Sequence, residues 1–263
     1  MVAEQHIGTM TGALMILAEK GLRYGGAIDV GCADGHFNLL HWELGILRGA
    51  TFLNVDARAL YEDSLAEIRA TLGGHYFICA AAERAGTIAM TQSAHPYWDS
   101  ARPAGDPYWQ RVSDLAGRTV DVPARTIDAL VAETALPGPY LLKLDIQGSE
   151  LAALRGAAKT LADTDTIVVE ADVDDFTAIH DHVVGAGFDL FDVTNLGRGV
   201  DRTLGSFYPV YLNRRRRGLV DRRLWAKADD AAIIRQMGER RAQVRRIIAD
   251  VLARAKAAGI TKS

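Results

Sequence analysis

The chain has 263 residues, of which 49% are hydrophobic and 24% are charged, a balance typical of a globular protein with a sizeable core. Its two cysteines, Cys32 and Cys79, are too few for a disulfide framework. No apolar run approaches the ~20 residues that span a bilayer, and the polar start of the chain does not resemble a signal peptide. We therefore expect a cytoplasmic protein without a membrane span.

The net charge of −3 hides an uneven distribution along the chain. Residues 1–213 hold 28 acidic and 15 basic side chains, whereas residues 214–263 hold 5 acidic and 15 basic ones. This asymmetry predicts one large domain over residues 1–213, followed by a basic extension over residues 214–263. A run of four arginines, Arg214 to Arg217, opens the extension.

Hydrophobic periodicity predicts strands that alternate with helices through the large domain. We expect helices over residues 8–21, 35–47, 58–72, 149–161 and 176–185. We expect strands over residues 27–30, 51–55, 76–80, 140–144, 166–169, 187–193 and 206–212. Such alternation predicts an α/β fold with a mainly parallel sheet and helices on both faces. The last two strands lack a helix between them, so they are expected to form an antiparallel pair at the edge.

Residues 91–117 interrupt this pattern. They lack periodicity and contain two clusters of proline and aromatic residues, H-P-Y-W at 95–98 and G-D-P-Y-W at 105–109. A long stretch of this kind is typical of a functional loop. Its Tyr97, Trp98 and Trp109 are candidate substrate-binding residues, because their rings can stack on a sugar or another ring.

The turn after the first strand carries the first binding signal. Asp29 precedes Gly31 and Gly35, and glycines let the backbone approach a ligand closely. A nicotinamide-binding turn would instead read G-x-G-x-x-G, with its acid about 20 residues later. An acid before the glycines suits a cofactor that carries an ammonium group, such as S-adenosylmethionine. The alternative is a plain strand–helix turn capped by Asp34.

Acids also end two further strands. Asp56 follows the second strand, about 20 residues beyond the glycine turn, where an acid can accept both hydroxyls of a ribose. Asp145 follows the strand that contains Lys143, a residue type that is rarely buried unless it is paired. Each acid could alternatively cap the following helix. Gly148 allows a sharp turn, and Glu150 in the first helical turn would favour the helix dipole.

Three segments together resemble the FkbM family of S-adenosylmethionine-dependent methyltransferases: D-V-G at 29–31 with Gly35, V-P-A-R-T-I-D at 122–128, and K-L-D-I-Q-G-S-E at 143–150. The resemblance spans about residues 25–171 and implies the Rossmann-like class I methyltransferase fold. The segment 81–87 also resembles the family's stretch near the adenine. The family often reads E-P-N where this chain has D-A-R at 56–58. The resemblance implies these cofactor-binding residues: Asp29, Gly31, Ala33, Gly35, Asp56, Ala57, Ala82, Glu83 and Asp145.

Methyl transfer needs alignment of donor and acceptor, and a hydroxyl acceptor also benefits from a general base. The candidate catalytic residues are Asp145, as the base or its orienter, with Lys143 and His36. His95 is an alternative base, although a histidine in a loop is more often only solvated. Gln147 and Glu150 are candidate substrate-binding residues.

A divalent metal ion is a further alternative. Asp145 and Glu170 end successive strands, and Asp172, Asp174 and Asp175 follow, which together form an oxygen-rich cluster that would suit Mg²⁺ or Ca²⁺. We favour the interpretation that these residues form a solvated acidic loop before the helix at 176–185.

The basic extension is expected to contain one long helix, at about residues 230–257, with a narrow apolar stripe. The stripe includes Ile233, Met237, Val244, Ile248 and Val251. Such a helix could dock on an acidic surface, nucleic acid or an anionic membrane. We favour docking on the acidic main domain, or on a second subunit in a homo-oligomer.

The favoured function is O-methylation of a hydroxyl on a sugar, a glycan or a natural product. One alternative is a methyltransferase that modifies nucleic acid and uses the basic extension for phosphate contacts. The acidic main domain argues against it, and the chain carries no dedicated nucleic-acid motif. The other alternative is a non-catalytic assembly module that retains the cofactor pocket.

Overall fold

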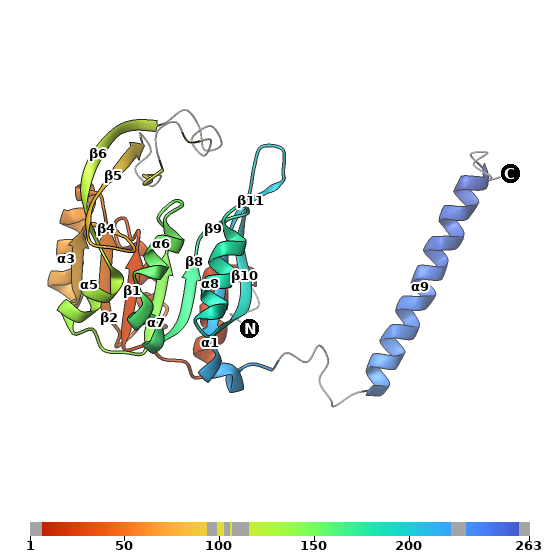
Figure 1. Ribbon diagram of the computed structural model, residues 1–263. Helices are drawn as coiled ribbons and strands as arrows, with labels where there is room; N and C mark the ends of the chain where they lie inside the picture. The colour runs from red at the N-terminus through yellow and green to blue at the C-terminus, as the bar shows by residue number, and fades with distance from the viewer. Residues whose placement is uncertain (1–6, 94–98, 103–105, 107–115, 222–229, 258–263) are drawn as a thin grey trace. The chain divides into compact units, whose positions relative to one another are not determined.

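The computed structural model describes residues 7–93, 99–102, 106, 116–221 and 230–257 (Figure 1). The chain divides into two compact units, Met1–Leu219 and Val220–Ser263. In the first unit the strands are β1 Gly26–Val30, β2 Thr51–Asp56, β3 His75–Ile78, β4 Ala80–Ala81, β5 Gly86–Ser93, β6 Ala116–Arg125, β7 Tyr140–Leu144, β8 Thr164–Val169, β9 Ala171–Asp172, β10 Phe188–Arg198 and β11 Leu204–Asn213. The α-helices there are α1 Met10–Glu19, α2 His36–Glu43, α3 Glu62–Leu72, α5 Ile127–Thr134, α6 Glu150–Arg155, α7 Ala158–Asp163 and α8 Phe176–Gly185, and 3-10 helices η2 Ala59–Tyr61 and η3 Arg214–Leu219 accompany them.

Among the described residues, eight strands form the main sheet, in the order β10-β11-β8-β7-β1-β2-β3, with β9 paired to β11. The five neighbouring strands β8, β7, β1, β2 and β3 are parallel to one another. Strand β11 runs antiparallel to both of its neighbours, β8 and β10. The predicted α/β fold with a mainly parallel sheet is therefore confirmed. The antiparallel pair is also present, although only β10 lies at the edge, because β11 is hydrogen-bonded on both sides.

The centre of the sheet is buried and mostly apolar, with Asp29 of β1 opposite Lys143 of β7 as a charged exception. Every residue of β1 and β7 is buried. In the pairing of β1 with its neighbours, Val30 lies opposite Val55 on one side and Leu144 on the other. The three strands therefore end at the same level, and the segments that follow them meet at one edge of the sheet.

Helices cover both faces of this sheet. In Figure 1, α6, α7 and α8 lie in front of the strands and α1 lies behind them. The predicted helix over 149–161 is in fact two helices, because the chain turns at Gly156, where an added Cβ would collide with the carbonyl oxygen of Ala82. Helix α5 was not expected from the sequence. Its N-cap is Thr126, whose hydroxyl accepts a hydrogen bond from the N–H of Ala129.

A second, smaller sheet has the order β4-β6-β5 and was missed by the periodicity. The antiparallel strands β5 and β6 flank the stretch that the sequence assigned to a long loop. That loop prediction is wrong at both ends, because β5 continues to Ser93 and β6 already begins at Ala116. Residues 99–102 return to β5, where the backbone of Ser100 exchanges two hydrogen bonds with that of Thr91.

The arginine run that opens the basic extension belongs to the first unit and pairs with acids of β8 and β10. Arg215 and Arg216 both pair with the fully buried Asp165, with nearest N–O distances of 2.8 and 2.9 Å. Arg214 and Arg217 pair with the more exposed Asp189, at 2.9 and 2.7 Å. The run therefore neutralises two acids of the main domain.

This arrangement predicts unequal effects for two matched double variants of the full chain. Replacing Arg215 and Arg216 by alanine leaves the carboxylate of Asp165 buried without a counter-charge, so the free energy of unfolding should fall by about 2–4 kcal/mol. Replacing Arg214 and Arg217 instead should cost at most about 1 kcal/mol, because those pairs are solvated. Denaturant unfolding of both variants measures the difference, and equal losses would contradict the assignment.

The second unit contains helix α9, Asp230–Ala257. Large apolar side chains along α9 are exposed, namely Ile234, Met237, Val244, Ile247, Ile248 and Val251. No helix in the described residues is both long and apolar enough to cross a bilayer.

Candidate functional site

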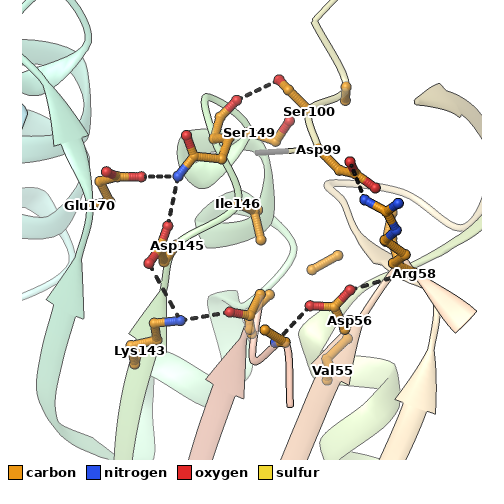
Figure 2. Close-up of a pocket in the computed structure, with 18 of the residues that line it drawn as sticks. Val55, Asp56, Arg58, Asp99, Ser100, Lys143, Asp145, Ile146, Ser149 and Glu170 are labelled. Carbon is orange, nitrogen blue, oxygen red and sulfur yellow. Dashed lines mark hydrogen bonds and ion pairs between the residues drawn. The ribbon is translucent and has the colours of Figure 1, made fainter. Parts of the chain in front are cut away.

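A cavity of about 350 Å³ opens where β1, β2 and β7 end (Figure 2). Open α/β sheets bind their ligands at this edge, beyond the carboxyl ends of the strands. The residues that line the cavity include Gly31, Ala33, His36, Asp56, Ala57, Arg58, Ala80, Ala81, Met90, Asp99, Ser100, Lys143, Asp145, Gln147, Glu170 and Tyr208.

The glycine turn forms the centre of the cavity floor. Gly31 has a φ of 71°, and an added Cβ would collide with the carbonyl oxygen of Asp145. Only glycine can therefore follow β1 so closely beside the end of β7. Gly35 has a φ of 82° and precedes α2, but it is not among the described residues that line the cavity.

Lys143 and Asp29 form a buried ion pair below this floor. The Lys143 Nζ lies 3.0 Å from Asp29 Oδ1 and donates a hydrogen bond of 2.7 Å to the carbonyl of Gly31. Both side chains are almost fully buried, and the Asp29 oxygens accept no hydrogen bond of regular geometry from the described residues. Burial raises the pKa of Asp29, although the Lys143 charge partly offsets it. Burial alone would lower the pKa of Lys143, but the attraction of Asp29 and Asp145 raises it.

Asp56 lies at the end of β2, on one side of the glycine turn. Its Oδ2 accepts a hydrogen bond of 2.8 Å from the N–H of Ala33, and its Oδ1 accepts one of 2.9 Å from the N–H of Arg58. Burial raises its pKa, while these two hydrogen bonds lower it. A carboxylate oxygen has two lone pairs, so each oxygen can accept a further hydrogen bond from a ligand.

Asp145 follows β7, on the other side of the turn, and its carboxylate interacts with Lys143, Gln147, Tyr208 and Glu170. The Gln147 amide donates to Oδ1 at 2.9 Å, and the Tyr208 hydroxyl donates to Oδ2 at 2.9 Å. The Lys143 Nζ lies 3.7 Å from the same Oδ2. Burial would raise the pKa of Asp145, but Lys143 and the hydrogen bonds lower it below its usual range. Asp145 is therefore an ionised carboxylate that faces the cavity.

Glu170 follows β8 and lies beside Asp145. Its Oε2 accepts a hydrogen bond of 2.6 Å from the same amide nitrogen of Gln147. Burial, and then the negative charge of Asp145, raise the pKa of Glu170 to about 10. Among the described residues, no group of three or more acidic, histidine or cysteine side chains is arranged to hold a metal ion.

Glu150 is buried and is not among the described residues that line the cavity. Its Oε1 accepts a hydrogen bond of 2.8 Å from the N–H of Ile146, and its Oε2 accepts one of 2.9 Å from the N–H of Gly148. Burial raises the pKa of Glu150 to about 7, although these hydrogen bonds lower it in part. Glu150 thus holds the turn at 146–148, in which Gln147 and Gly148 have φ values of 55° and 98°. Its carboxylate binds this turn and does not face the cavity.

Other predicted site residues lie apart from this group. His36 lines the cavity, but its side chain is 70% exposed and pairs with Asp34 at 2.9 Å. Glu83 points to Arg155, 3.7 Å away, and Ala82 donates its N–H to the carbonyl of Arg125. The cavity wall here is formed by Ala80 and Ala81, which precede the residues expected from the sequence. His95, Tyr97, Trp98 and Trp109 lie outside the described residues.

Several cavity residues were not anticipated from the sequence. Tyr208 comes from β11, and no local motif marks it. Ser100 donates its hydroxyl to the carbonyl of Gln147 at 2.5 Å. Arg58 pairs with Asp99 at 3.0 Å, which ties the segment 99–102 to the end of β2. Only Arg58 had a signal in the sequence. It stands in D-A-R at 56–58, where the FkbM family often reads E-P-N, so an arginine was to be expected beside the ribose site.

The fold and the cavity at the ends of β1, β2 and β7 define a Rossmann-like α/β domain of the methyltransferase type. A family model described as the Methyltransferase FkbM domain matches residues 42–190, which is more than half of the chain. The chain therefore belongs to the FkbM methyltransferase family. The match begins after the glycine turn at 29–35 and includes the segment 143–150.

Solved structures of other methyltransferases are similar to parts of this chain. An FkbM methyltransferase from Methylobacillus flagellatus KT has 15% identity and a TM-score of 0.44, with 79% of this chain and 57% of that chain covered. This chain thus spans a little over half the length of that relative. A precorrin-6y C5,15-methyltransferase from Geobacter metallireducens GS-15 has 8% identity and a TM-score of 0.38. The match covers 80% of this chain and 92% of that chain. A putative tRNA methyltransferase from Streptococcus pneumoniae in complex with S-adenosyl-L-methionine has 11% identity and a TM-score of 0.40, with 78% and 73% covered. No curated protein sequence matches the chain significantly.

Proposed function

We propose that this chain is an S-adenosylmethionine-dependent O-methyltransferase that acts on a hydroxyl of a sugar, a glycan or a natural product. The observation that carries the proposal is the arrangement of two acids around the glycine turn. Asp56 ends β2 and Asp145 follows β7, on either side of β1, and both face the same cavity. One acid is thus available to bind the cofactor and the other to bind the acceptor.

The residues on the β2 side fit the cofactor. Asp56 has free lone pairs for two ribose hydroxyls, and Gly31 lines the cavity at a point where a side chain would collide with the backbone of Asp145. The apolar wall of Ala57, Ala81 and Met90 suits an adenine ring. Bound there, S-adenosylmethionine would supply a methyl group on a positively charged sulfur.

Replacing Asp56 by alanine is expected to weaken S-adenosylmethionine binding by about 10- to 100-fold, the effect of losing hydrogen bonds to a charged group. Isothermal titration calorimetry measures the dissociation constant, and the thermal shift caused by the cofactor should shrink accordingly. Glu83→Ala is the matched control, because this acid pairs with Arg155 away from the cavity. Equal losses in both variants would contradict the assignment of the ribose site.

The residues on the β7 side fit an uncharged hydroxyl. Asp145 is ionised and fixed by Gln147 and Tyr208, so it can accept a proton from a hydroxyl held in the cavity. Glu170 adds a second carboxyl at this end of the cavity. A neutral polyhydroxylated acceptor is compatible with this environment, whereas a phosphate group would be repelled by the Asp145 charge.

The test is a screen with S-adenosylmethionine that carries a labelled methyl group, applied to pools of glycans and hydroxylated metabolites, with Asp145→Ala as the control. Transfer to a hydroxyl that the variant loses would support the proposal. Tight cofactor binding without transfer to any acceptor would instead favour a non-catalytic module. Transfer to RNA with a steep dependence on salt would favour a nucleic-acid substrate.

We further propose that the basic extension serves assembly, through pairing of α9 with α9 of a second copy. The exposed apolar side chains of α9 support this proposal. Light scattering of the full chain, compared with a chain that ends at Leu219, tests whether α9 sets the oligomeric state.

A further inference from the structure

One amide group joins the two carboxyl groups at the acceptor end of the cavity. The Gln147 Nε2 lies 2.9 Å from Asp145 Oδ1 and 2.6 Å from Glu170 Oε2, so this one nitrogen donates to two acids. In Figure 2, dashed lines run from Asp145 and from Glu170 to one nitrogen between them. Gln147 is held in this position by the backbone, because Ser100 binds its carbonyl and Glu150 fixes the turn on either side of it. The two carboxyl groups therefore cannot move apart without losing a hydrogen bond to this amide.

Few positive charges balance these acids. Lys143 lies 3.7 Å from Asp145, but it is closer to Asp29, at 3.0 Å. In the described parts of the chain, no cationic side chain lies within ion-pair distance of Glu170. The charged or titratable groups that face Glu170 are Asp145 after β7, Glu150 of α6, Asp172 of β9 and Tyr208 of β11. Arg102 pairs with Asp106, Asp172 and Asp175.

Two carboxylates held this close without a cation between them cannot both be ionised at low energetic cost, and such a pair takes up one proton. The protonated member should be the one farther from Lys143 and with fewer donors. Asp145 accepts from both Gln147 and Tyr208, whereas Glu170 accepts from Gln147. The raised pKa of Glu170 and the lowered pKa of Asp145 agree with this order.

We propose that Glu170 is a positioning residue that works as a neutral carboxylic acid, and that a proton, and no divalent cation, balances its pairing with Asp145. The role of Glu170 in catalysis rests on the proposed function, since Asp145 is the proposed proton acceptor. The protonation state of Glu170 does not depend on whether the protein transfers a methyl group. Glu170 keeps Gln147 and Asp145 in place without adding a second negative charge beside the acceptor.

Infrared spectroscopy of the full chain tests the proposal without an acceptor. The spectrum should be recorded near pH 8.5, above the pKa of about 7 for Glu150 and below the pKa of about 10 for Glu170, so that Glu150 is mostly ionised while Glu170 still carries its proton. The C=O stretch of a buried protonated carboxyl group is expected in the native protein and should be lost in Glu170→Gln. Glu133→Gln is the matched control, an exposed glutamate paired with Arg125, and it should leave the band unchanged. Absence of the band, or its persistence in Glu170→Gln, would overturn the proposal.

The pH dependence of stability provides a second measurement. A carboxyl group whose pKa is raised by folding stabilises the fold at low pH and loses this contribution as the pH rises toward its folded pKa. Glutamine has no such dependence, so the denaturant midpoint of Glu170→Gln relative to the native protein should rise steadily from about pH 5 to pH 10. A constant difference would count against a protonated Glu170.

Titration with MgCl₂ or MnCl₂ alone distinguishes a proton from a metal ion. Saturable heat that disappears in Glu170→Gln, together with loss of the infrared band on adding the metal, would overturn the proposal. No saturable heat in either protein would support it. Failure of the O-methyltransferase proposal is recognised separately, by the absence of methyl transfer, and leaves the infrared and pH results unaffected.

Discussion

Replacing Lys143 by methionine is expected to lower the free energy of unfolding by about 3–5 kcal/mol at neutral pH, the usual cost of removing one partner from a buried ion pair. Methionine has nearly the same length, so the core stays filled and the effect comes from charge. The carboxylate of Asp29, which is fully buried, would then lack its only close cation among the described residues. The carbonyl of Gly31 would also lose its hydrogen bond. Urea unfolding followed by circular dichroism measures the loss.

The double variant Asp29→Asn with Lys143→Met is the control. It removes both charges and should be more stable than Lys143→Met alone, because no isolated charge stays buried. The single variant should also recover part of its stability in acid. Without Lys143 the pKa of Asp29 rises further, so the folded state takes up a proton that the unfolded state, with a pKa near 3.9, binds only at lower pH. A deficit that grows as the pH falls would contradict this interpretation.

The strand-ending acids illustrate what the sequence could predict. Asp56 and Asp145 each follow an apolar run, and parallel strands bring the residues after such runs to one edge of the sheet. The register of β1 with β2 and β7 places them there. The unusual Lys143 within a buried strand required a partner, and Asp29, the acid of the same edge motif, provides it.

The positions of Glu150, Glu83 and Ala82 show why local sequence cannot predict the other residues of the candidate site. An acid at the start of a helix can either face the cavity or bind the preceding turn, and the positive φ values of Gln147 and Gly148 decide the second outcome for Glu150. Pairing of β4 with β6 directs Ala82 toward Arg125, so Glu83 leaves the cavity. Both outcomes depend on backbone conformation, which for Ala82 is set by pairing with a strand more than 40 residues away.

Tyr208 and the arginine run depend on contacts that are remote in sequence. Tyr208 is 63 residues from Asp145 and reaches it because β11 runs antiparallel beside β8. The arginines at 214–217 resemble the start of a partner-binding tail, but Arg215 and Arg216 pair with Asp165, 50 and 51 residues earlier in the chain. The other two pair with Asp189, 25 and 28 residues earlier. Periodicity and motif spacing contain no information about such pairs.

Replacing Asp145 by asparagine is expected to lower the rate of methyl transfer by about 10²- to 10⁴-fold at saturating cofactor, the usual contribution of a general base. Asparagine keeps the shape of the side chain and can still accept a hydrogen bond from Gln147, so the turn at 146–148 should persist. What is lost is the group that accepts the proton of the acceptor hydroxyl. Single-turnover transfer to the acceptor found in the screen measures the chemical step separately from binding.

Tyr208→Phe is the comparison that tests the base directly. It removes one hydrogen bond to Asp145 while leaving the carboxylate in place. Because that hydrogen bond lowers the pKa of Asp145, its loss raises this pKa. The acid limb of the rate profile should therefore move to higher pH in Tyr208→Phe, with a smaller loss of rate at alkaline pH than in Asp145→Asn. If Asp145→Asn kept its full rate and His36→Ala lost it, the role of base would pass to His36, which lines the same cavity.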